Sequence, residues 1–311
     1  MKLGLRTLAQ STETRVHKLR DTLRILCKHP LTRDRKARTL AWYVTLQVRT
    51  RLSYRPVIVP FVEDTKLLIG QNMDSKRADV AVGLFEFQDM GFLLHALRGD
   101  SLFVDVGANV GFYSILAGGV VGSPCVALEP VPQTFERLRE NLELNGLHEI
   151  VRAQNLGVGS QPGTLRFTWT EGANNHVLTR DSEDSSIPVT VTSLDDLLAD
   201  EEASPTIIKI DVEGWEAEVI RGAAEVLGRS DPMALIIELC DGDRYGFDED
   251  EIDETLRAYG FAPVIYNPLE RHLEEIGGRR MGKNTIYVNE FDFFANRIES
   301  SKSYSILGQQ I

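Results

Sequence analysis

The segment Phe-Val-Asp-Val-Gly-Ala-Asn-Val-Gly at residues 103–111 constrains this chain more than any other. An apolar run enters a turn in which Gly107 and Gly111 let the backbone bend sharply and approach a ligand closely. Asn109, between them, is the side-chain-bearing residue type that best tolerates a left-handed conformation. A second apolar run, at residues 126–128, ends at the acidic Glu129. An acid at the end of the second strand of such a unit can accept hydrogen bonds from ribose hydroxyls, so the pattern predicts a nucleoside-cofactor site.

The turn departs from the pattern of a pyrophosphate site. That pattern has three glycines with bare amides at a helix N-terminus, whereas this turn lacks the third glycine and has Asp105 just upstream. A carboxylate there repels a phosphate but suits a cofactor with a cationic centre, such as the sulfonium and ammonium groups of S-adenosylmethionine. Taken alone, the motif leaves two other interpretations open: an aspartate that only caps local amides, and a nicotinamide site.

Strands and helices alternate along most of the chain. Pro132 begins a helix with Phe135, Leu138 and Leu142 on one face, and Asn145 with Gly146 ends it. Apolar runs predict strands at 102–106, 125–129, 150–155, 206–211, 234–240, 261–267 and 284–289. Because several of these runs are continuously apolar, the sequence predicts an α/β fold with a doubly wound, mostly parallel sheet that is covered on both faces.

Other segments frame this pattern. Residues 1–52 are predicted to be helical with a break at Pro30, and 57–62 with 66–69 to form a hairpin around Glu63-Asp64. An inserted pair of alternating segments, 164–170 and 187–191, carries a polar loop at 171–176 that is placed to overhang the site. The residues after 290 give no clear signal.

Four blocks in order resemble the FkbM-type S-adenosylmethionine-dependent methyltransferases. They are Asp105–Gly111, Glu129-Pro130 with the helix that follows, Val191–Leu197, and Lys209–Gly214. The resemblance covers about residues 84–290 and implies a Rossmann-like class I methyltransferase domain there, with seven strands of which the last is antiparallel. Residues 1–83 then form a basic helical and hairpin extension, and 291–311 a C-terminal tail. The implied function is O-methylation of a hydroxyl on a sugar, a glycan or lipopolysaccharide component, or a polyketide-like natural product, with S-adenosyl-L-methionine as the cofactor.

The candidate site residues gather at strand ends, where open α/β sheets bind ligands. On the cofactor side we expect Asp105, Gly107, Asn109, Gly111, Glu129 and Asn155. On the acceptor side we expect a general base among Asp211, Glu213, His176 and Glu238, because methyl transfer to oxygen releases a proton. Strand alternation places Lys209 and Asp211 on the same side of their strand. The competing interpretation is that these two residues form a structural ion pair and take no part in the reaction. No metal ion is assigned, although Asp211, Glu213 and Glu238 could together hold a divalent cation.

Charge is distributed unevenly. Residues 1–56 contain fourteen Lys and Arg against three Asp and Glu, which leaves −23 for the remainder because the whole chain carries −12. An acidic body disfavours a nucleic-acid substrate, which usually needs a basic groove. The basic segment is expected to pack against this body as a lid, with peripheral contact to an anionic membrane as the alternative.

The three cysteines, Cys27, Cys125 and Cys240, lack C-x-x-C spacing and are expected to be free thiols. No secretory signal or membrane-spanning run is evident, so the chain is expected to be cytoplasmic. A nicotinamide-dependent oxidoreductase and a non-catalytic glycan-assembly scaffold with the same fold remain as alternative functions.

Overall fold

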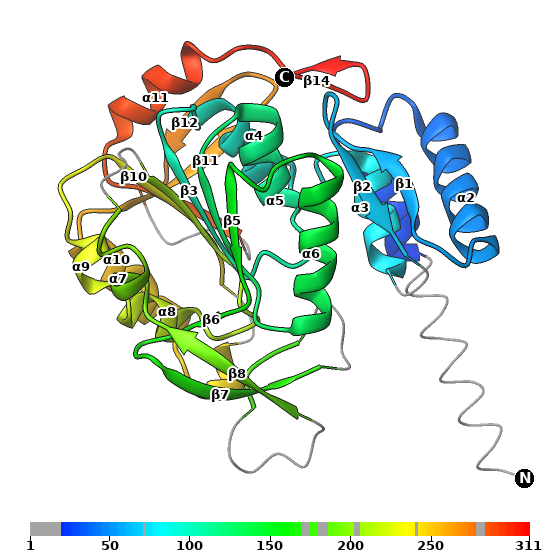
Figure 1. The fold of residues 1–311 in the computed structure, drawn as a ribbon. Coiled ribbons are helices and arrows are strands. Elements are labelled where there is room, and N and C mark those ends of the chain that lie inside the picture. Colours follow the sequence, from blue (N-terminus) through cyan, green and yellow to red (C-terminus); the bar gives the residue numbers. More distant parts are fainter. Residues whose placement is uncertain are drawn as a thin grey trace, which may run out of the picture.

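A mixed eight-stranded sheet runs through the middle of the molecule, with helices on both faces (Figure 1). The computed structural model describes residues 20–70, 73–169, 175–178, 186–201, 206–239, 242–277 and 284–311. In spatial order the strands are β12 (His272–Glu275), β11 (Ala262–Asn267), β13 (Asn284–Val288), β10 (Met233–Glu238), β9 (Thr206–Ile210), β3 (Leu102–Val106), β4 (Cys125–Leu128) and β5 (Val151–Gln154).

The sheet has the predicted topology. Neighbouring strands from β10 through β9, β3 and β4 to β5 pair in parallel, whereas β13 is antiparallel to both β10 and β11. All seven predicted strands are therefore confirmed, and so is the antiparallel direction of the last one. No sequence pattern predicted β12, which adds an antiparallel edge strand beside β11. The order of strands reverses at β3, so the carboxyl ends of β3 and its neighbours flank the topological switch point.

Two hydrophobic cores lie on opposite faces of the sheet because successive side chains of a buried strand point to opposite sides. On β3, for example, Phe103 belongs to one core and Val104 to the other. Helices on the first face are α4 (Phe87–Ala96), α5 (Phe112–Ile115), the π-helix η1 (Leu116–Val121), α6 (Pro132–Leu144) and α11 (Phe291–Glu299). On the second face are α7 (Leu194–Leu197), α8 (Glu216–Arg221), α9 (Ala224–Leu227) and α10 (Glu249–Ala258), with the short 3-10 helix η3 (Gly242–Tyr245) preceding α10.

The predicted insertion forms a small sheet of its own below the main one (Figure 1). In it, β8 (Ser186–Thr192) pairs with β7 (Gly163–Thr168) on one side and with β6 (Gly157–Val158) on the other. Residues 171–174 of the predicted overhanging loop lie outside the described residues, and only 175–176 are within them.

The N-terminal segment packs on the first face. It contains a helix at residues 20–28, α2 (Lys36–Leu52), the predicted hairpin of β1 (Val57–Pro60) and β2 (Lys66–Ile69), and α3 (Asp74–Val82). Side-chain oxygens of Asn141 on α6 and of Asn145, which caps that helix, accept hydrogen bonds at 2.8 Å from the backbone amides of Leu68 and Lys66. These bonds tie the hairpin to α6. The part of the predicted helical region before residue 20 lies outside the described residues.

The segment after residue 290 is ordered, although its sequence gave no clear signal. It forms α11 and a short hairpin of β14 (Ser305–Ile306) and β15 (Gln309–Gln310). Phe294, Ile298, Tyr304 and Ile306 are buried in the core of the first face. Cys27 and Cys125 are free thiols as expected, while Cys240 lies outside the described residues. Within the described residues, no helix combines the length and the apolar composition needed to cross a bilayer.

Candidate functional site

A cleft opens at the carboxyl ends of β3, β4, β9 and β10, at the predicted switch point. It holds about 1100 Å³ of space, part of it open to solvent, which is ample for a small-molecule site. Main-sheet strands and the loops after them supply Asp105, Gly107, Ala108, Asn109, Glu129, Pro130, Val131, Lys209, Asp211, Val212, Glu213, Trp215 and Glu238. Helices of the first face add Phe112, Tyr113 and Thr134, α3 adds Lys76, and the turn between α3 and α4 adds Phe85 and Glu86. The insertion with its approach adds Leu156, Gly157, Phe167, Asn175 and Val177.

The glycine turn has the backbone geometry that its sequence predicts. Gly107, Asn109 and Gly111 all adopt left-handed conformations, with φ of 83°, 52° and 92°. A Cβ atom added to Gly107 would lie 1.9 Å from the carbonyl oxygen of Asp211, so the loop after β3 and the loop after β9 touch through their backbones there. This contact brings the two loops together at the floor of the cleft.

We expect Gly107→Ala to lower the free energy of unfolding by about 2–4 kcal/mol, from the clash with the Asp211 carbonyl together with the left-handed strain. Gly146→Ala is the matched control, because Gly146 also has a positive φ of 66° but open space around its Cβ position. It should cost only the strain, about 1 kcal/mol. Urea denaturation of both variants measures the difference, and equal losses would show that the two loops do not touch.

Glu129 is buried in the cleft with both carboxylate oxygens engaged. Oε2 accepts from the backbone amide of Asn109 at 2.9 Å, and Oε1 from that of Val131 at 2.9 Å. Burial nevertheless raises the pKa of Glu129 to about 7, although the two amides act to lower it. Each oxygen retains capacity for a further hydrogen bond, so the carboxylate can accept from a pair of neighbouring hydroxyls.

Two residues expected on the cofactor side do not line the cleft. Asn155 donates from its side-chain amide to the carbonyl oxygens of Glu129 and Pro130, at 2.8 and 2.9 Å. It therefore holds the backbone that presents Glu129. Gly111 precedes α5, where a Cβ would lie 2.6 Å from Leu138, so its contribution is to the packing between α5 and α6.

Two buried charges form the base of the cleft. The Lys209 ammonium lies 2.7 Å from Oδ2 of Asp211 and 4.8 Å from the centre of the Tyr113 ring. Asp105 accepts a hydrogen bond of 2.6 Å from the Ser114 hydroxyl. Burial raises the pKa of Asp105, and the charge of Lys209 acts against that rise. The structure thus confirms that Lys209 and Asp211 share one side of the strand and pair with each other.

Asp211 and Glu238 form a hydrogen-bonded carboxyl pair at the ends of β9 and β10. Burial opposes ionisation of Asp211, but the charge of Lys209 and its hydrogen bond hold the pKa of Asp211 below its ordinary value. Burial and the neighbouring charge of Asp211 raise the pKa of Glu238 to about 7. These opposite shifts favour a proton on Glu238, and its raised pKa would let that proton exchange near neutral pH.

The loop after β9 is held by a second buried carboxyl. Oε1 of Glu216 accepts from the backbone amides of Val212 and Gly214, at 3.1 and 3.2 Å. Burial raises the pKa of Glu216 to about 8. Glu213, between these amides, adopts a left-handed conformation with φ of 54° and lines the cleft. Its predicted place on the acceptor side is compatible with this position.

His176 is not among the residues that line the cleft, whereas Asn175 and Val177 on either side of it are. Its carbonyl oxygen accepts from the backbone amide of Thr168 on β7, and its own amide donates to the hydroxyl of the same threonine, at 3.0 Å each. Alternate residues of such an extended segment point to opposite sides. Of the four acceptor-side candidates, the structure brings together Asp211, Glu213 and Glu238.

The N-terminal segment contributes cleft residues that the sequence did not reveal. Lys76 on α3 lies 3.8 Å from Asp79 and 5.6 Å from the centres of the Phe85 and Phe112 rings. The Tyr113 hydroxyl donates to Oε2 of Glu86 at 2.6 Å. No motif marks these positions, because their role depends on α3 and α4 folding over the end of β3.

Acidic groups dominate the described lining of the cleft. Six carboxyl groups face two lysines, and both lysines lie within 4.0 Å of a carboxylate. Within the described residues, no group of three or more His, Cys, Asp or Glu has the arrangement of a metal site.

The family model and the curated relatives that match this chain are all described as methyltransferases. A family model described as "Methyltransferase FkbM domain" matches residues 105–263, just over half of the chain. Hexuronic acid methyltransferase AglP of Haloferax volcanii is 31% identical over 136 residues, which are 43% of this chain and 55% of that protein. Methyltransferase 1 of Beauveria bassiana is 28% identical over 193 residues, 54% of this chain and 75% of the relative. The solved structure of precorrin-6y C5,15-methyltransferase from Geobacter metallireducens aligns with a TM-score of 0.37 at 15% identity, covering 65% of this chain and 86% of that one.

Proposed function

This chain belongs to the family of methyltransferases with an FkbM domain, and we propose that it transfers the methyl group of S-adenosylmethionine to a hydroxyl of a neutral sugar. The observation that carries the proposal is the arrangement of Glu129 and the Asp211–Glu238 pair in one cleft. The first provides acceptors for a ribose, and the second provides a carboxyl that exchanges its proton near neutral pH.

The residues of the cleft fit S-adenosylmethionine chemically. Glu129 can accept from two ribose hydroxyls, as argued from its free acceptor capacity. Pro130, Val131 and Leu156 provide apolar surface beside it for a purine ring. The acidic Asp105 lies deeper, where it suits the cationic end of the molecule. When bound, S-adenosylmethionine supplies a methyl group on a sulfonium, which an acceptor oxygen can displace.

The Asp211–Glu238 pair is suited to accept the proton of the acceptor hydroxyl. A general base works best when its pKa lies near the operating pH, and that of Glu238 is about 7. In the ionised state, the Glu238 carboxylate takes the hydroxyl proton, while Lys209 keeps Asp211 ionised beside it. Orientation of the acceptor by the surrounding walls supplies much of the remaining rate.

A neutral sugar is the acceptor class that the charges of the cleft favour. A uronate or phosphate group would approach Asp211, Glu213 and Glu238, while both lysines of the cleft already lie near acidic partners. Strand-end carboxylates accept hydrogen bonds from sugar hydroxyls readily. One relative is named for methylation of a hexuronic acid, which supports a sugar acceptor but leaves its charge to be tested. The matched segment covers only 55% of that relative, so its substrate is not transferred to this chain.

We expect Glu129→Gln to weaken S-adenosylmethionine binding by about 1.5–3 kcal/mol, the scale of hydrogen bonds to a charged group. The affinity of the unaltered protein for S-adenosylmethionine should also rise as the pH increases through about 7, because burial has raised the pKa of Glu129 to that value. Only the ionised Glu129 carboxylate accepts hydrogen bonds from both ribose hydroxyls. Calorimetric titration measures both effects, and the variant should lose this pH dependence.

Glu136→Gln is the control for this titration, since Glu136 is an exposed carboxylate on α6 outside the cleft. Unchanged affinity in a folded Glu129→Gln protein would remove Glu129 from the cofactor site. Thermal-shift measurements with S-adenosylmethionine, S-adenosylhomocysteine, NAD and NADP test the cofactor class itself. Stabilisation by the first two alone is expected, whereas stabilisation by a nicotinamide cofactor alone would overturn the proposal.

A further inference from the structure

Leu40, Trp42 and Tyr43 pack, partly buried, against the body of the molecule, but helix α2 carries apolar side chains on its solvent side as well. Its buried residues are Thr39, Leu46 and Thr50, of which two are polar. The hydroxyls of the threonines bond within the helix, to the carbonyl oxygens of Arg35 and Leu46. The solvent side of the same helix carries valines and a leucine. A surface helix usually keeps its apolar stripe on the core side only, so the fold itself does not account for the apolar side chains on the solvent side.

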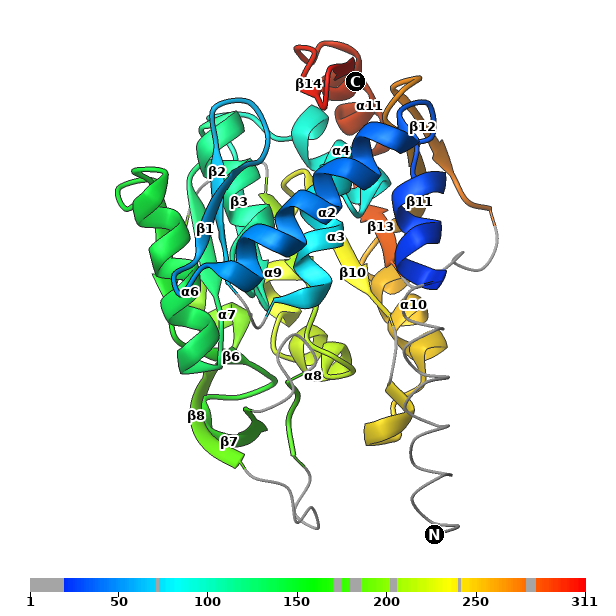
Figure 2. The ribbon, with the colours of Figure 1, turned by 90° about the vertical axis from the view of Figure 1, so that its right-hand side faces the viewer.

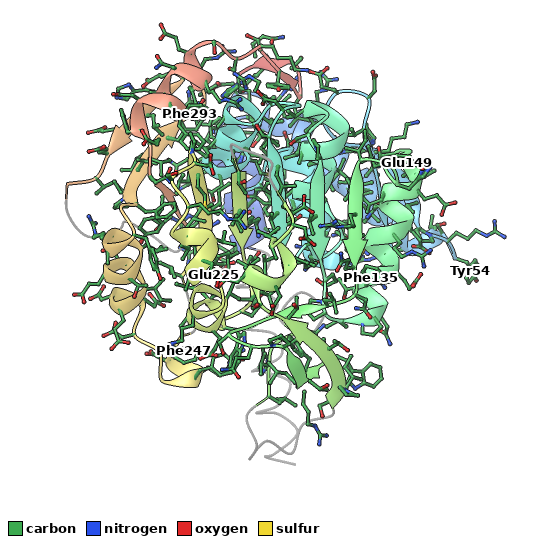
Figure 3. All side chains as sticks on the ribbon, turned by 60° about the vertical axis from the view of Figure 1, so that its left-hand side comes forward. Tyr54, Phe135, Glu149, Glu225, Phe247 and Phe293 are labelled. Carbon is green, nitrogen blue, oxygen red and sulfur yellow. The ribbon has the colours of Figure 1, made fainter. Side chains whose placement is uncertain are left out.

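The apolar residues on the outside form a regular stripe. Val44, Val48 and Leu52 follow one another at four-residue intervals and are 57%, 50% and 77% exposed. Tyr54, just beyond the helix, is fully exposed and projects away from the body of the molecule (Figure 3). Figure 2 shows α2 lying along the outer face of the molecule, with the helix at residues 20–28 beside its beginning.

Exposed apolar side chains are concentrated in this region. Among the described residues, eleven large apolar side chains are exposed, and seven of them lie between residues 23 and 58. The other four, Ile150, Trp169, Tyr259 and Leu269, lie on separate parts of the chain. Single exposed apolar residues are ordinary, but a stripe of them on one helix marks a surface that binds something.

The stripe is flanked by positive charge only. Between residues 36 and 62 the sequence has five Lys and Arg and no Asp or Glu. Arg49, Arg51 and Arg55 lie beside Val48, Leu52 and Tyr54 in the chain, and all three are exposed. Residues 57–311 carry −23, so an anionic partner meets less repulsion on this face than on the acidic body.

We propose that this basic apolar face, made of Val44, Val48, Leu52 and Tyr54 with Arg49, Arg51 and Arg55, docks on an anionic phospholipid bilayer. Aliphatic side chains on one helix can enter the boundary between headgroups and acyl chains, while flanking arginines meet the phosphates. Tyrosine suits the headgroup level because its ring is apolar and its hydroxyl is polar. Dimerisation through the same face would bring like charges together. Elsewhere on the described surface of a second copy, the exposed large apolar side chains lie apart from one another, so they form no patch that could cover the stripe.

Docking through this face places the cleft close to the bilayer. Gln47 of α2 accepts a hydrogen bond of 3.2 Å from Arg77 of α3, the same helix that carries Lys76 into the cleft. One helix therefore separates the docking face from the cleft wall.

Co-sedimentation of the full chain with vesicles tests the proposal. The protein should bind vesicles of phosphatidylcholine mixed with phosphatidylserine and not vesicles of phosphatidylcholine alone, and binding should weaken as salt is added. The double variant Val48→Ser, Leu52→Ser should lower the partition coefficient by about tenfold or more. Replacing Arg49, Arg51 and Arg55 with Gln should lower it about a hundredfold, from roughly fivefold for each charge near an anionic surface.

Leu269→Ser is the matched control, because Leu269 is an exposed leucine away from this face, and it should bind as the unaltered protein does. All of these positions are exposed, so melting temperatures should stay unchanged. The proposal is overturned if the unaltered protein does not bind phosphatidylserine vesicles at low salt. It is equally overturned if the double serine variant and the triple glutamine variant bind these vesicles as well as the unaltered protein does. It is also overturned if the protein binds no vesicles but forms a dimer that Val48→Ser, Leu52→Ser dissociates, or binds duplex RNA through the arginines instead.

Discussion

Glu238→Gln should lower the rate of methyl transfer by about 10²- to 10⁴-fold, the contribution of a general base, while leaving S-adenosylmethionine affinity within about twofold. Glutamine keeps the shape of the side chain and can still donate to Asp211, so the carboxyl pair loses its exchangeable proton without losing its hydrogen bond. Asp211→Asn is a less clean test, because it would also remove the partner of the buried Lys209.

The pH dependence of this rate provides a second readout. Because burial and Asp211 raise the pKa of Glu238 to about 7, turnover at saturating cofactor should rise as the pH increases through that value, where the carboxyl loses its proton. Glu238→Gln should abolish this inflection. Glu149→Gln is the control, since the Glu149 side chain is 86% exposed and lies away from the cleft at the molecular edge (Figure 3). A Glu238→Gln enzyme with near-normal turnover and the same inflection would assign the base elsewhere.

Lys209→Met should lower the free energy of unfolding by about 3–5 kcal/mol, the usual cost of removing one partner from a buried ion pair. Lys209 is only 5% exposed, and its ammonium compensates the charge of Asp211 directly and that of Asp105 nearby. Methionine fills a similar volume, so the loss comes from the uncompensated carboxylates and not from a cavity. Urea denaturation measures it.

Lys66→Met is the control for the lysine, because Lys66 is exposed on β2, and it should change stability by less than about 0.5 kcal/mol. The double variant Lys209→Met, Asp211→Asn should cost less than the sum of the two single changes by about 0.5–3 kcal/mol, since the pair acts as one unit. Strict additivity would mean that Lys209 and Asp211 do not stabilise each other.

The sheet could be predicted from the sequence because its strands are marked by their burial. Ile207 to Ile210 and Leu102 to Val106 are buried throughout, and such runs are continuously apolar or nearly so. The edge strand β12 escaped prediction for the opposite reason. Three of its four residues are exposed, and its sequence, His-Leu-Glu-Glu, has a single apolar residue. The segment after residue 290 was missed because its core contacts, such as Phe294 and Tyr304, are made with distant elements.

The candidate site could be predicted where backbone geometry fixes it. The left-handed turn at Gly107, Asn109 and Gly111 follows from residue type, and the strand ends at Glu129 and Asp211 follow from the topology. The sequence places Asn155 near the site but does not predict its hydrogen-bond partners. Its bonds to the carbonyl oxygens of Glu129 and Pro130 depend on how the loops pack together. These roles in the reaction remain predictions.

The wall of the cleft formed by the N-terminal segment could not be predicted. Lys76 and Glu86 line the cleft, where Glu86 accepts from the Tyr113 hydroxyl, only because the segment from α3 to the start of α4 folds back onto the site. That packing depends on long-range contacts, such as the bonds between the hairpin and α6, which no local pattern encodes. For His176 the sequence was misleading instead. An imidazole is a suitable general base, but side chains of an extended segment alternate, and here the two neighbours of His176 line the cleft while His176 does not.

The central claim is methyl transfer from S-adenosylmethionine to the hydroxyl of a neutral sugar, and the most direct test identifies the product. The protein is incubated with S-adenosylmethionine carrying an isotopically labelled methyl group and with a panel of neutral oligosaccharides and their uronate counterparts. The products are then examined by nuclear magnetic resonance, which separates a methyl ether from a methyl ester. We expect a labelled methyl ether on a neutral acceptor that is formed by the Glu149→Gln control and lost in Glu238→Gln. A methyl ester formed on the uronates alone, or no transfer to any acceptor by a protein that binds S-adenosylmethionine, would contradict the account.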